Sequence, residues 1–217
     1  MGINMLPSNT VSKNVLLLDQ KPHITQSEYH AMQEACMREY ENKARKGVRA
    51  LYVRDRNCLL MELMWVTGAR ITDVLNFKVS DIDTYDKSIH FYVQKRDHMH
   101  KLSLESDVII HIQNYITKWD IKDYLFSSVP GGKPLSRFTA LKIIQKYGKL
   151  AGIGDNVHPH LFRHGCAVRM VESGVPLEIV SYYLDHADTK TTTQFYARIT
   201  HNTAEKIIKE RVGSMLG

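Results

Sequence analysis

Apolar side chains recur at helical spacing along most of the chain, which predicts a mostly helical protein. We expect the first helices over residues 25–46, 52–66, 71–75, 106–118 and 137–150. Later helices are expected near residues 160–172, 176–185, 190–196 and 203–214. Because the segment 52–66 is apolar on nearly every side, it should be the buried central helix.

One short stretch alternates as a strand does. Residues 89–93 alternate between apolar and polar side chains, and residues 101–104 could form an antiparallel partner. Asp81–Asp83 and Asp86–Lys87 are interpreted as turns, and Pro130–Gly132 as a loop. The predicted fold class is therefore α+β: mostly helical, with one small antiparallel sheet or hairpin.

Helix-end signals support these boundaries. Thr25 and Glu28 have the spacing of a capping box, and Gly68 is placed to turn the chain out of the central helix. Ser136 could cap the helix at 137–150. No linker or internal repeat divides the sequence, so we expect residues 1–23 to be a leader and residues 24–217 to be one domain.

Charge and cysteine content narrow the class of protein. The formal net charge of +6 favours a polyanionic partner such as nucleic acid. The three cysteines are isolated, which argues against a disulfide framework or a thiolate metal site and favours the reducing cytoplasm. No run of 18 apolar residues is present, so no membrane-spanning segment is expected.

The polar residues most suggestive of chemistry are two arginines, a lysine, two histidines and a tyrosine: Arg70, Lys95, His160, Arg163, His186 and Tyr196. The cations and imidazoles could hold a phosphate, and the phenol could attack it. His160 and Arg163 lie one helical turn apart, and Asp73 follows Arg70 at the same spacing. Taken singly, most of these side chains are as well explained as surface or packing residues.

Three stretches stand out: Arg54–Arg56 with Thr67–Leu75, then Val157–His164, then Tyr183–Tyr196. Taken together, they resemble the catalytic domain of the tyrosine recombinase, or phage integrase, family. The resemblance covers nearly everything from residue 24 onward. It implies a site-specific DNA recombinase that cuts and rejoins strands through a 3′-phosphotyrosine intermediate, as in the integration of mobile elements.

The resemblance also implies a role for each matching residue. Arg70 and Arg163 would hold the non-bridging oxygens of the scissile phosphate, His186 would bind a phosphate oxygen, and Asp73 would steady Arg70.

The nucleophile and the proton carriers follow from the same likeness. Tyr196 would attack the phosphorus, and Lys95, at the expected hairpin tip, would protonate the departing 5′-hydroxyl. His160 would assist proton transfer. Arg96 and Lys101 are competing candidates for the role of Lys95.

This chain departs from the family pattern at several positions. Asp185 stands where the family usually has glycine, and Tyr196 is ten rather than nine residues after His186. The hairpin reads Gln94–Asp97 without glycine. An N-terminal core-binding domain is expected to be absent, which fits either an isolated catalytic domain or a short member similar to the fimbrial-type invertases.

The expected partner is double-stranded DNA, with a tetramer on DNA and a monomer when free. A basic helix face could contact DNA through Arg137, Thr139, Lys142 and Lys146. No cofactor or metal is expected: Asp81, Asp83 and Asp86 are read as solvent-exposed turn carboxylates. A bacterial, phage or plasmid origin is expected.

Two other functions remain open. Residues 176–196 could form a helix-turn-helix in a DNA-binding regulator without catalysis. A type IB topoisomerase would use the same tyrosine chemistry to relax DNA. The regulator does not explain the complete phosphate-binding set, and the short length and the His160 box favour a recombinase over a topoisomerase.

Overall fold

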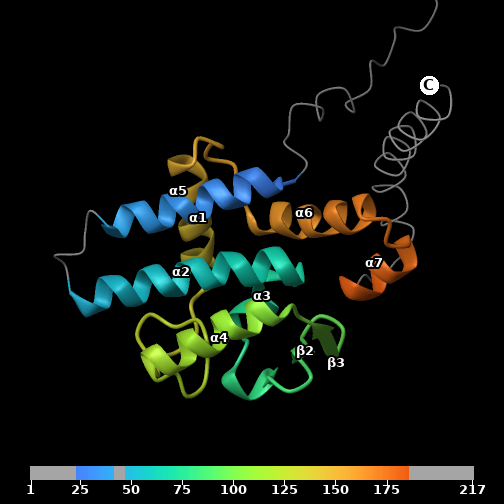
Figure 1. Cartoon of the computed structure of the whole chain (residues 1–217), viewed down its shortest axis with the longest axis horizontal. Helices are drawn as coiled ribbons and strands as arrows, with labels where there is room; N and C mark the ends of the chain where they lie inside the picture. The colour runs from blue at the N-terminus through green and yellow to red at the C-terminus, as the bar shows by residue number, and fades with distance from the viewer. Residues whose placement is uncertain (1–22, 42–46, 186–217) are drawn as a thin grey trace, which may run out of the picture.

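The computed structural model describes residues 23–41 and 47–185, and this part of the chain is mostly helical (Figure 1). Its helices are α1 (Gln26–Glu41), α2 (Val48–Thr67), α3 (Ile71–Leu75), α4 (Ser106–Trp119), α5 (Arg137–Leu150), α6 (Pro159–Glu172) and α7 (Leu177–Tyr183). A 3-10 turn, η2 (Val79–Asp81), leads into strands β1 (Ile82–Asp83), β2 (Ser88–Val93) and β3 (His98–Ser103). The predicted α+β class is confirmed. The helices expected near 190–196 and 203–214 lie outside the described residues.

Helix α2 is the centre of the core, as predicted. Helices α1, α3, α4 and α6 all pack against it, and Leu60, Met61 and Leu63 are fully buried (Figure 1). The helix begins at Val48, earlier than expected, because its exposed first turn carries no apolar periodicity. A helix with buried side chains on most sides needs neighbours all round, and these four supply them.

The predicted caps are present. The backbone N–H of Thr25 donates to Glu28 Oε2 at 2.9 Å, and the N–H of Glu28 donates to Thr25 Oγ1 at 3.3 Å. Ser136 Oγ accepts from the N–H of Thr139 at 3.1 Å. Gly68 ends α2 with a φ of 58°, a left-handed conformation that glycine adopts freely.

The three strands form one antiparallel sheet in the order β1-β2-β3. Val93 pairs with His98, so residues 94–97 form the tip of the β2–β3 hairpin. The interpretation of Asp81–Asp83 as a turn was wrong, because Ile82 and Asp83 pair with β2. Strand β3 also begins earlier than expected, at His98, because its first inward side chain is the polar His100.

Helices α6 and α7 share a small apolar cluster that sets the position of the end of α7. It contains Cys166, Ala167, Val171, Val180 and Leu184. Cys166 is buried within this cluster. Within the described part of the chain, no helix is long and apolar enough to cross a membrane.

Candidate active site

One pocket brings together four of the six candidate side chains, and they come from segments far apart in the sequence. Its lining includes Arg70, Lys95, His160 and Arg163. Arg70 precedes α3, Lys95 lies at the hairpin tip, and the other two lie in the first turns of α6. Arg137, at the start of α5, lines the same pocket. His186 and Tyr196 lie outside the described residues.

Arg163 is buried and held by two backbone carbonyls. Its Nη1 donates to the carbonyl of Gly68 at 2.9 Å, and its Nη2 donates to the carbonyl of Leu184. These bonds join the start of α6 to the ends of α2 and α7. The guanidinium is therefore fixed in orientation before any ligand arrives.

Arg70 is oriented by the residue that follows α7. Its Nη2 donates to the backbone carbonyl of Asp185 at 2.9 Å, and its Nη1 donates to Asp185 Oδ2 at 3.1 Å. Asp73, the residue expected to steady Arg70, lies farther away, with 4.0 Å between Oδ2 and Nη1. Asp185 is thus the closer carboxylate, although in the sequence it stands out only as a departure from the family pattern.

Asp73 is buried near Arg70 and Arg163. Burial raises the pKa of its carboxyl group, while the positive charges of Arg70 and Arg163 act in the opposite direction. A backbone hydrogen bond with Gln94 also lowers its pKa and connects Asp73 to the hairpin. The carboxyl group therefore supports both the arginine pair and the hairpin tip.

The three cations of the hairpin that could protonate the leaving group have different surroundings. Lys101 pairs with Asp86 at the opposite end of the sheet, and Arg96 Nη1 donates to Asp185 Oδ1 at 2.7 Å. Lys95 lines the pocket with Arg70 and Arg163. Its position is thus the one from which a cation can face a ligand bound by both arginines.

His160 lies at the start of α6, after Pro159 at the first helical position. Desolvation lowers the pKa of its imidazole, and the charges of His158, Arg163, Arg137 and Arg70 lower it further. The neutral form is therefore favoured near pH 7. A neutral imidazole can accept a proton from an attacking hydroxyl group.

The expected DNA-contacting residues of α5 have different surroundings. Lys142 Nζ lies 4.3 Å from the centre of the exposed Phe138 ring, close to Arg137 in sequence. Lys146 Nζ instead donates to Glu39 Oε1 at 2.5 Å, which ties α5 to α1. Thr139 Oγ1 hydrogen-bonds with Ser136 Oγ at 2.9 Å.

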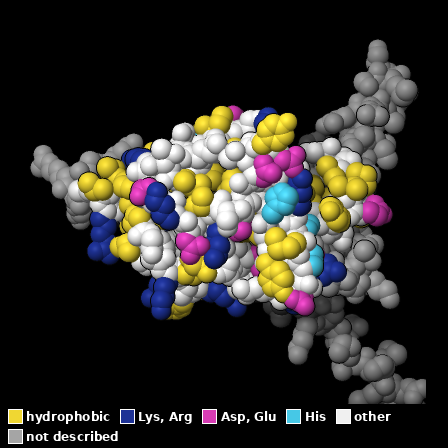
Figure 2. Space-filling view, turned by 90° about the horizontal axis from the view of Figure 1, so that it is seen from below, with side chains coloured by type: hydrophobic (Ala, Val, Ile, Leu, Met, Phe, Trp, Pro, Cys, Tyr) yellow, Lys and Arg dark blue, Asp and Glu magenta, His cyan; other side chains and the backbone are white. Residues whose placement is uncertain are grey.

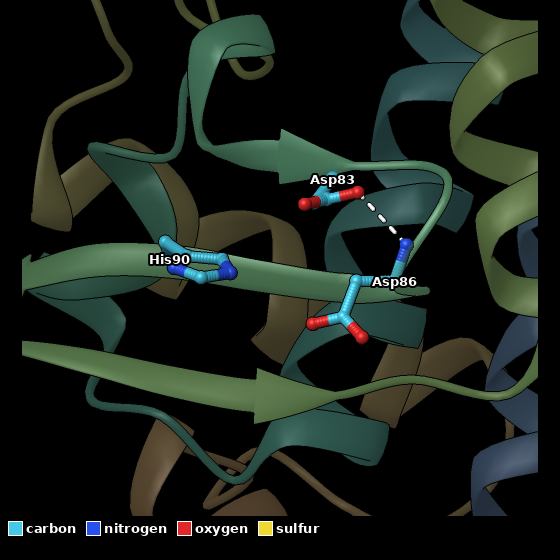
Figure 3. A group of neighbouring side chains, drawn as sticks. All are labelled: Asp83, Asp86 and His90. Carbon is cyan, nitrogen blue, oxygen red and sulfur yellow. Dashed lines mark hydrogen bonds between the residues drawn. The ribbon is translucent and has the colours of Figure 1, made fainter.

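One group of described residues has donor atoms close enough for a metal ion: Asp83, Asp86 and His90 (Figure 3). Asp83 Oδ1 accepts the backbone N–H of Asp86 at 2.8 Å, the contact drawn in Figure 3, and Asp86 pairs with Lys101. His90 Nε2 lies 2.9 Å from Ser88 Oγ. These contacts account for the group as polar residues at and beside the β1–β2 turn.

Known proteins match this chain in both sequence and structure. The model of the phage integrase family matches residues 23–203. The tyrosine recombinase XerA of Pyrococcus furiosus is 32% identical over 74% of this chain and 54% of its own length. The tyrosine recombinase XerD of Staphylococcus haemolyticus is 29% identical over 68% of this chain and 50% of its own length. The chain thus spans about half the length of these curated relatives.

Solved structures show the same fold. A XerA recombinase crystal structure aligns with a TM-score of 0.69 at 21% identity, over 91% of this chain and 68% of its own. A XerH recombinase bound to difH substrate aligns at 0.64 and 22% identity, over 81% of this chain and 50% of its own. With the family model matching most of the sequence, the chain belongs to the phage integrase family.

Proposed function

We propose that this chain is the catalytic domain of a site-specific DNA recombinase that cuts and rejoins strands through a 3′-phosphotyrosine link. The observation that carries the proposal is the convergence of Arg70, Lys95, His160 and Arg163 on one pocket. The similar structures include a recombinase bound to its DNA substrate and a lambda integrase tetramer bound to a Holliday junction. Residues 24–217 would form the domain, acting on double-stranded DNA as a tetramer and remaining a monomer when free.

The reaction needs positive charge around a phosphodiester. As the Tyr196 oxygen bonds to phosphorus, charge grows on the non-bridging oxygens, and Arg70, Arg163 and His186 would stabilise it. His160 would accept the phenol proton. When the P–O5′ bond breaks, Lys95 would give its proton to O5′. Reversal of these steps on a partner strand would rejoin the DNA without an external energy source.

A DNA substrate with a nick beside the cleavage point tests the proposal. The short fragment that carries the freed 5′-hydroxyl is lost after cleavage, and this traps the covalent intermediate. The native chain should form a protein–DNA adduct, visible as a band shift on denaturing gels. Tyr196→Phe should form none, whereas Tyr85→Phe, which alters an exposed tyrosine in the turn between β1 and β2, should behave as the native chain. An adduct that persists in Tyr196→Phe would exclude this nucleophile. Added chelator should not change the yield.

The same substrates separate the alternatives. A helix-turn-helix regulator would bind DNA without forming an adduct. A type IB topoisomerase would form the adduct but relax supercoiled plasmid without exchanging strands between two sites. Recombinant junctions in a two-site plasmid would support the recombinase, and relaxation alone would favour the topoisomerase.

The basic face of α5 gives a paired prediction for DNA binding. Lys142→Ala should weaken binding and reduce the slope of log K against log salt by about 0.9, the value for one phosphate contact. Lys146→Ala should have a smaller effect, because the Lys146 ammonium pairs with Glu39. Fluorescence anisotropy across a salt series measures both slopes. Equal slopes for the two variants would contradict this assignment of the contact surface.

His160 gives a prediction about pH. Desolvation and neighbouring positive charges lower the pKa of His160, so its imidazole should titrate below the ordinary value of about 6.5. Inorganic phosphate in the pocket should raise that pKa, because an anion stabilises the protonated form. NMR titration measures both, with His160→Gln to assign the signal. A midpoint at or above the ordinary value without phosphate would contradict the prediction.

A further inference from the structure

The carboxylate of Asp185 makes a second connection, besides that of Asp73, between the candidate active site and the hairpin tip. Asp185 is only 7% exposed and follows the last turn of α7. Its Oδ2 accepts from Arg70 Nη1 at 3.1 Å, and its Oδ1 accepts from Arg96 Nη1 at 2.7 Å. His98 Nε2 lies 3.2 Å from the same Oδ1. Both carboxylate oxygens are therefore engaged, one toward the pocket and one toward the hairpin.

The backbone at Asp185 is unusual for a residue with a side chain. Its φ is 54°, in the left-handed region that glycine adopts freely and that aspartate and asparagine tolerate better than most residues. A position where glycine would fit more readily thus retains a charged side chain with three polar partners.

Polar and aromatic side chains make the contact between the hairpin and α7. His100 Nε2 lies 3.0 Å from the carbonyl oxygen of Tyr183, and its ring packs edge-on against Tyr182 with centroids 5.8 Å apart. A small pocket separates the two elements, lined by Arg96, His98, His100, Ser181, Tyr182 and Asp185. Figure 2 shows histidine side chains gathered toward this end of the molecule, beside basic and acidic ones. Residues 94–97 are exposed, so apolar burial contributes little to the position of the tip.

We propose that Asp185 is a positioning residue that anchors the β2–β3 hairpin tip to the end of α7 and so holds Lys95 at the pocket. The proposal rests on the proposed function, in which Lys95 protonates the leaving oxygen. Lys95 is the neighbour of Arg96 in the same tight turn, so fixing Arg96 restricts where Lys95 can reach. The carboxylate would thus act on catalysis through the hairpin.

Removing the carboxylate should release the hairpin more than the arginines of the pocket. Arg70 Nη2 also bonds the backbone carbonyl of Asp185, and Arg163 bonds those of Gly68 and Leu184. Those carbonyls remain whatever side chain stands at position 185. Arg96 and His98, in contrast, meet Asp185 at its side-chain oxygen.

The test separates proton delivery from phosphate binding. Asp185→Asn keeps the size of the side chain and suits the left-handed backbone but removes the charge, and Asp185→Gly removes the side chain without strain. Single-turnover adduct formation is measured on a normal substrate and on one with sulfur in place of the bridging O5′. A thiolate leaves without a proton, because a thiol has an ordinary pKa of about 8.5. The sulfur substrate therefore bypasses Lys95.

Both variants should cleave the normal substrate at least about tenfold more slowly than the native chain. This loss is part of the rate enhancement that a general acid contributes. Both should cleave the sulfur substrate at close to the native rate. The matched control is Asp86→Asn, which removes the partner of Lys101 at the far end of the same sheet and should match the native chain on both substrates. Native rates on the normal substrate, equal losses on both substrates, or faster cleavage would each overturn the proposal.

A measurement without catalysis keeps the anchor testable if the proposed function fails. Hydrogen exchange of the amides at 94–99 should be faster in Asp185→Asn than in the native chain, and unchanged in Asp86→Asn. Absence of any adduct from the native chain would reject the recombinase proposal alone. Unchanged exchange at the tip in Asp185→Asn would reject the anchor alone.

Discussion

Replacing Arg163 with lysine is expected to slow adduct formation by about 10²–10³-fold, the usual effect of losing one preorganised donor to a developing oxyanion. Lysine keeps the positive charge but lacks the planar fork. Arg163 uses one arm for the carbonyl of Gly68 and another for that of Leu184, and this fixes how it faces the pocket. A single ammonium group cannot reproduce that arrangement and also hold a phosphate oxygen.

Arg56 provides the matched control for the loss of a buried arginine. It is also buried, and its Nη1 donates to the carbonyl of Ser127 at 2.9 Å, away from the pocket. Arg56→Lys should lower the melting temperature yet leave single-turnover cleavage near the native rate at temperatures where the chain is folded. If Arg163→Lys cleaved at the native rate, or if both variants lost the same activity, the catalytic assignment of Arg163 would be wrong.

Local signals explain which parts of the fold the sequence predicts well. Helix α3 and helix α5 have the expected bounds because an end signal marks each, with Gly68 before the first and Ser136 at the start of the second. Strand β1 was missed because two residues are too few to show alternation, and only its pairing with β2 makes it a strand. The start of β3 was missed because its first half is polar, so that the inward-facing residue there is His100 rather than an apolar one.

In the candidate site, too, the features set by neighbouring residues could be predicted from the sequence, and those set by contacts between distant elements could not. His160 and Arg163 lie one turn apart on α6, so their joint position was predictable from spacing alone. The roles of Lys95, Arg96 and Lys101 could not be separated from sequence, because their partners lie on other elements. Arg96, His98 and His100 do alternate toward one side of the hairpin, but nothing in that pattern indicates that α7 and Asp185 face them.

Gly165 offers the largest expected effect on stability among the helix glycines. A Cβ atom at this position would lie 2.4 Å from the backbone oxygen of Ile24 and 2.7 Å from Cζ3 of Trp65. Neither neighbour can move easily. The N–H of Ile24 donates to the carbonyl of Leu161 at 3.1 Å, and the Trp65 ring stacks on Tyr29 with centroids 5.0 Å apart.

Gly165→Ala is therefore expected to destabilise the chain by about 1–3 kcal/mol, as overpacking of a close contact does. On an exposed helix, replacing glycine with alanine would stabilise the fold by about 1 kcal/mol through helix propensity. A loss of stability in Gly165→Ala would therefore show that the clash outweighs this gain. The melting temperature should fall by about 2–4 °C for each kcal/mol lost. Gly148→Ala in α5 is the matched control, because its Cβ would lie 2.5 Å from Cγ2 of Val157 and 2.8 Å from its Cβ, with the backbone oxygen of Gly154 at 3.3 Å. No backbone atom would lie as close to this Cβ as the Ile24 oxygen would to a Cβ at Gly165, so Gly148→Ala should cost less. A melting temperature that rises in Gly165→Ala, or falls less than in Gly148→Ala, would mean that α6 does not approach α2 as closely as the packing of Trp65 requires.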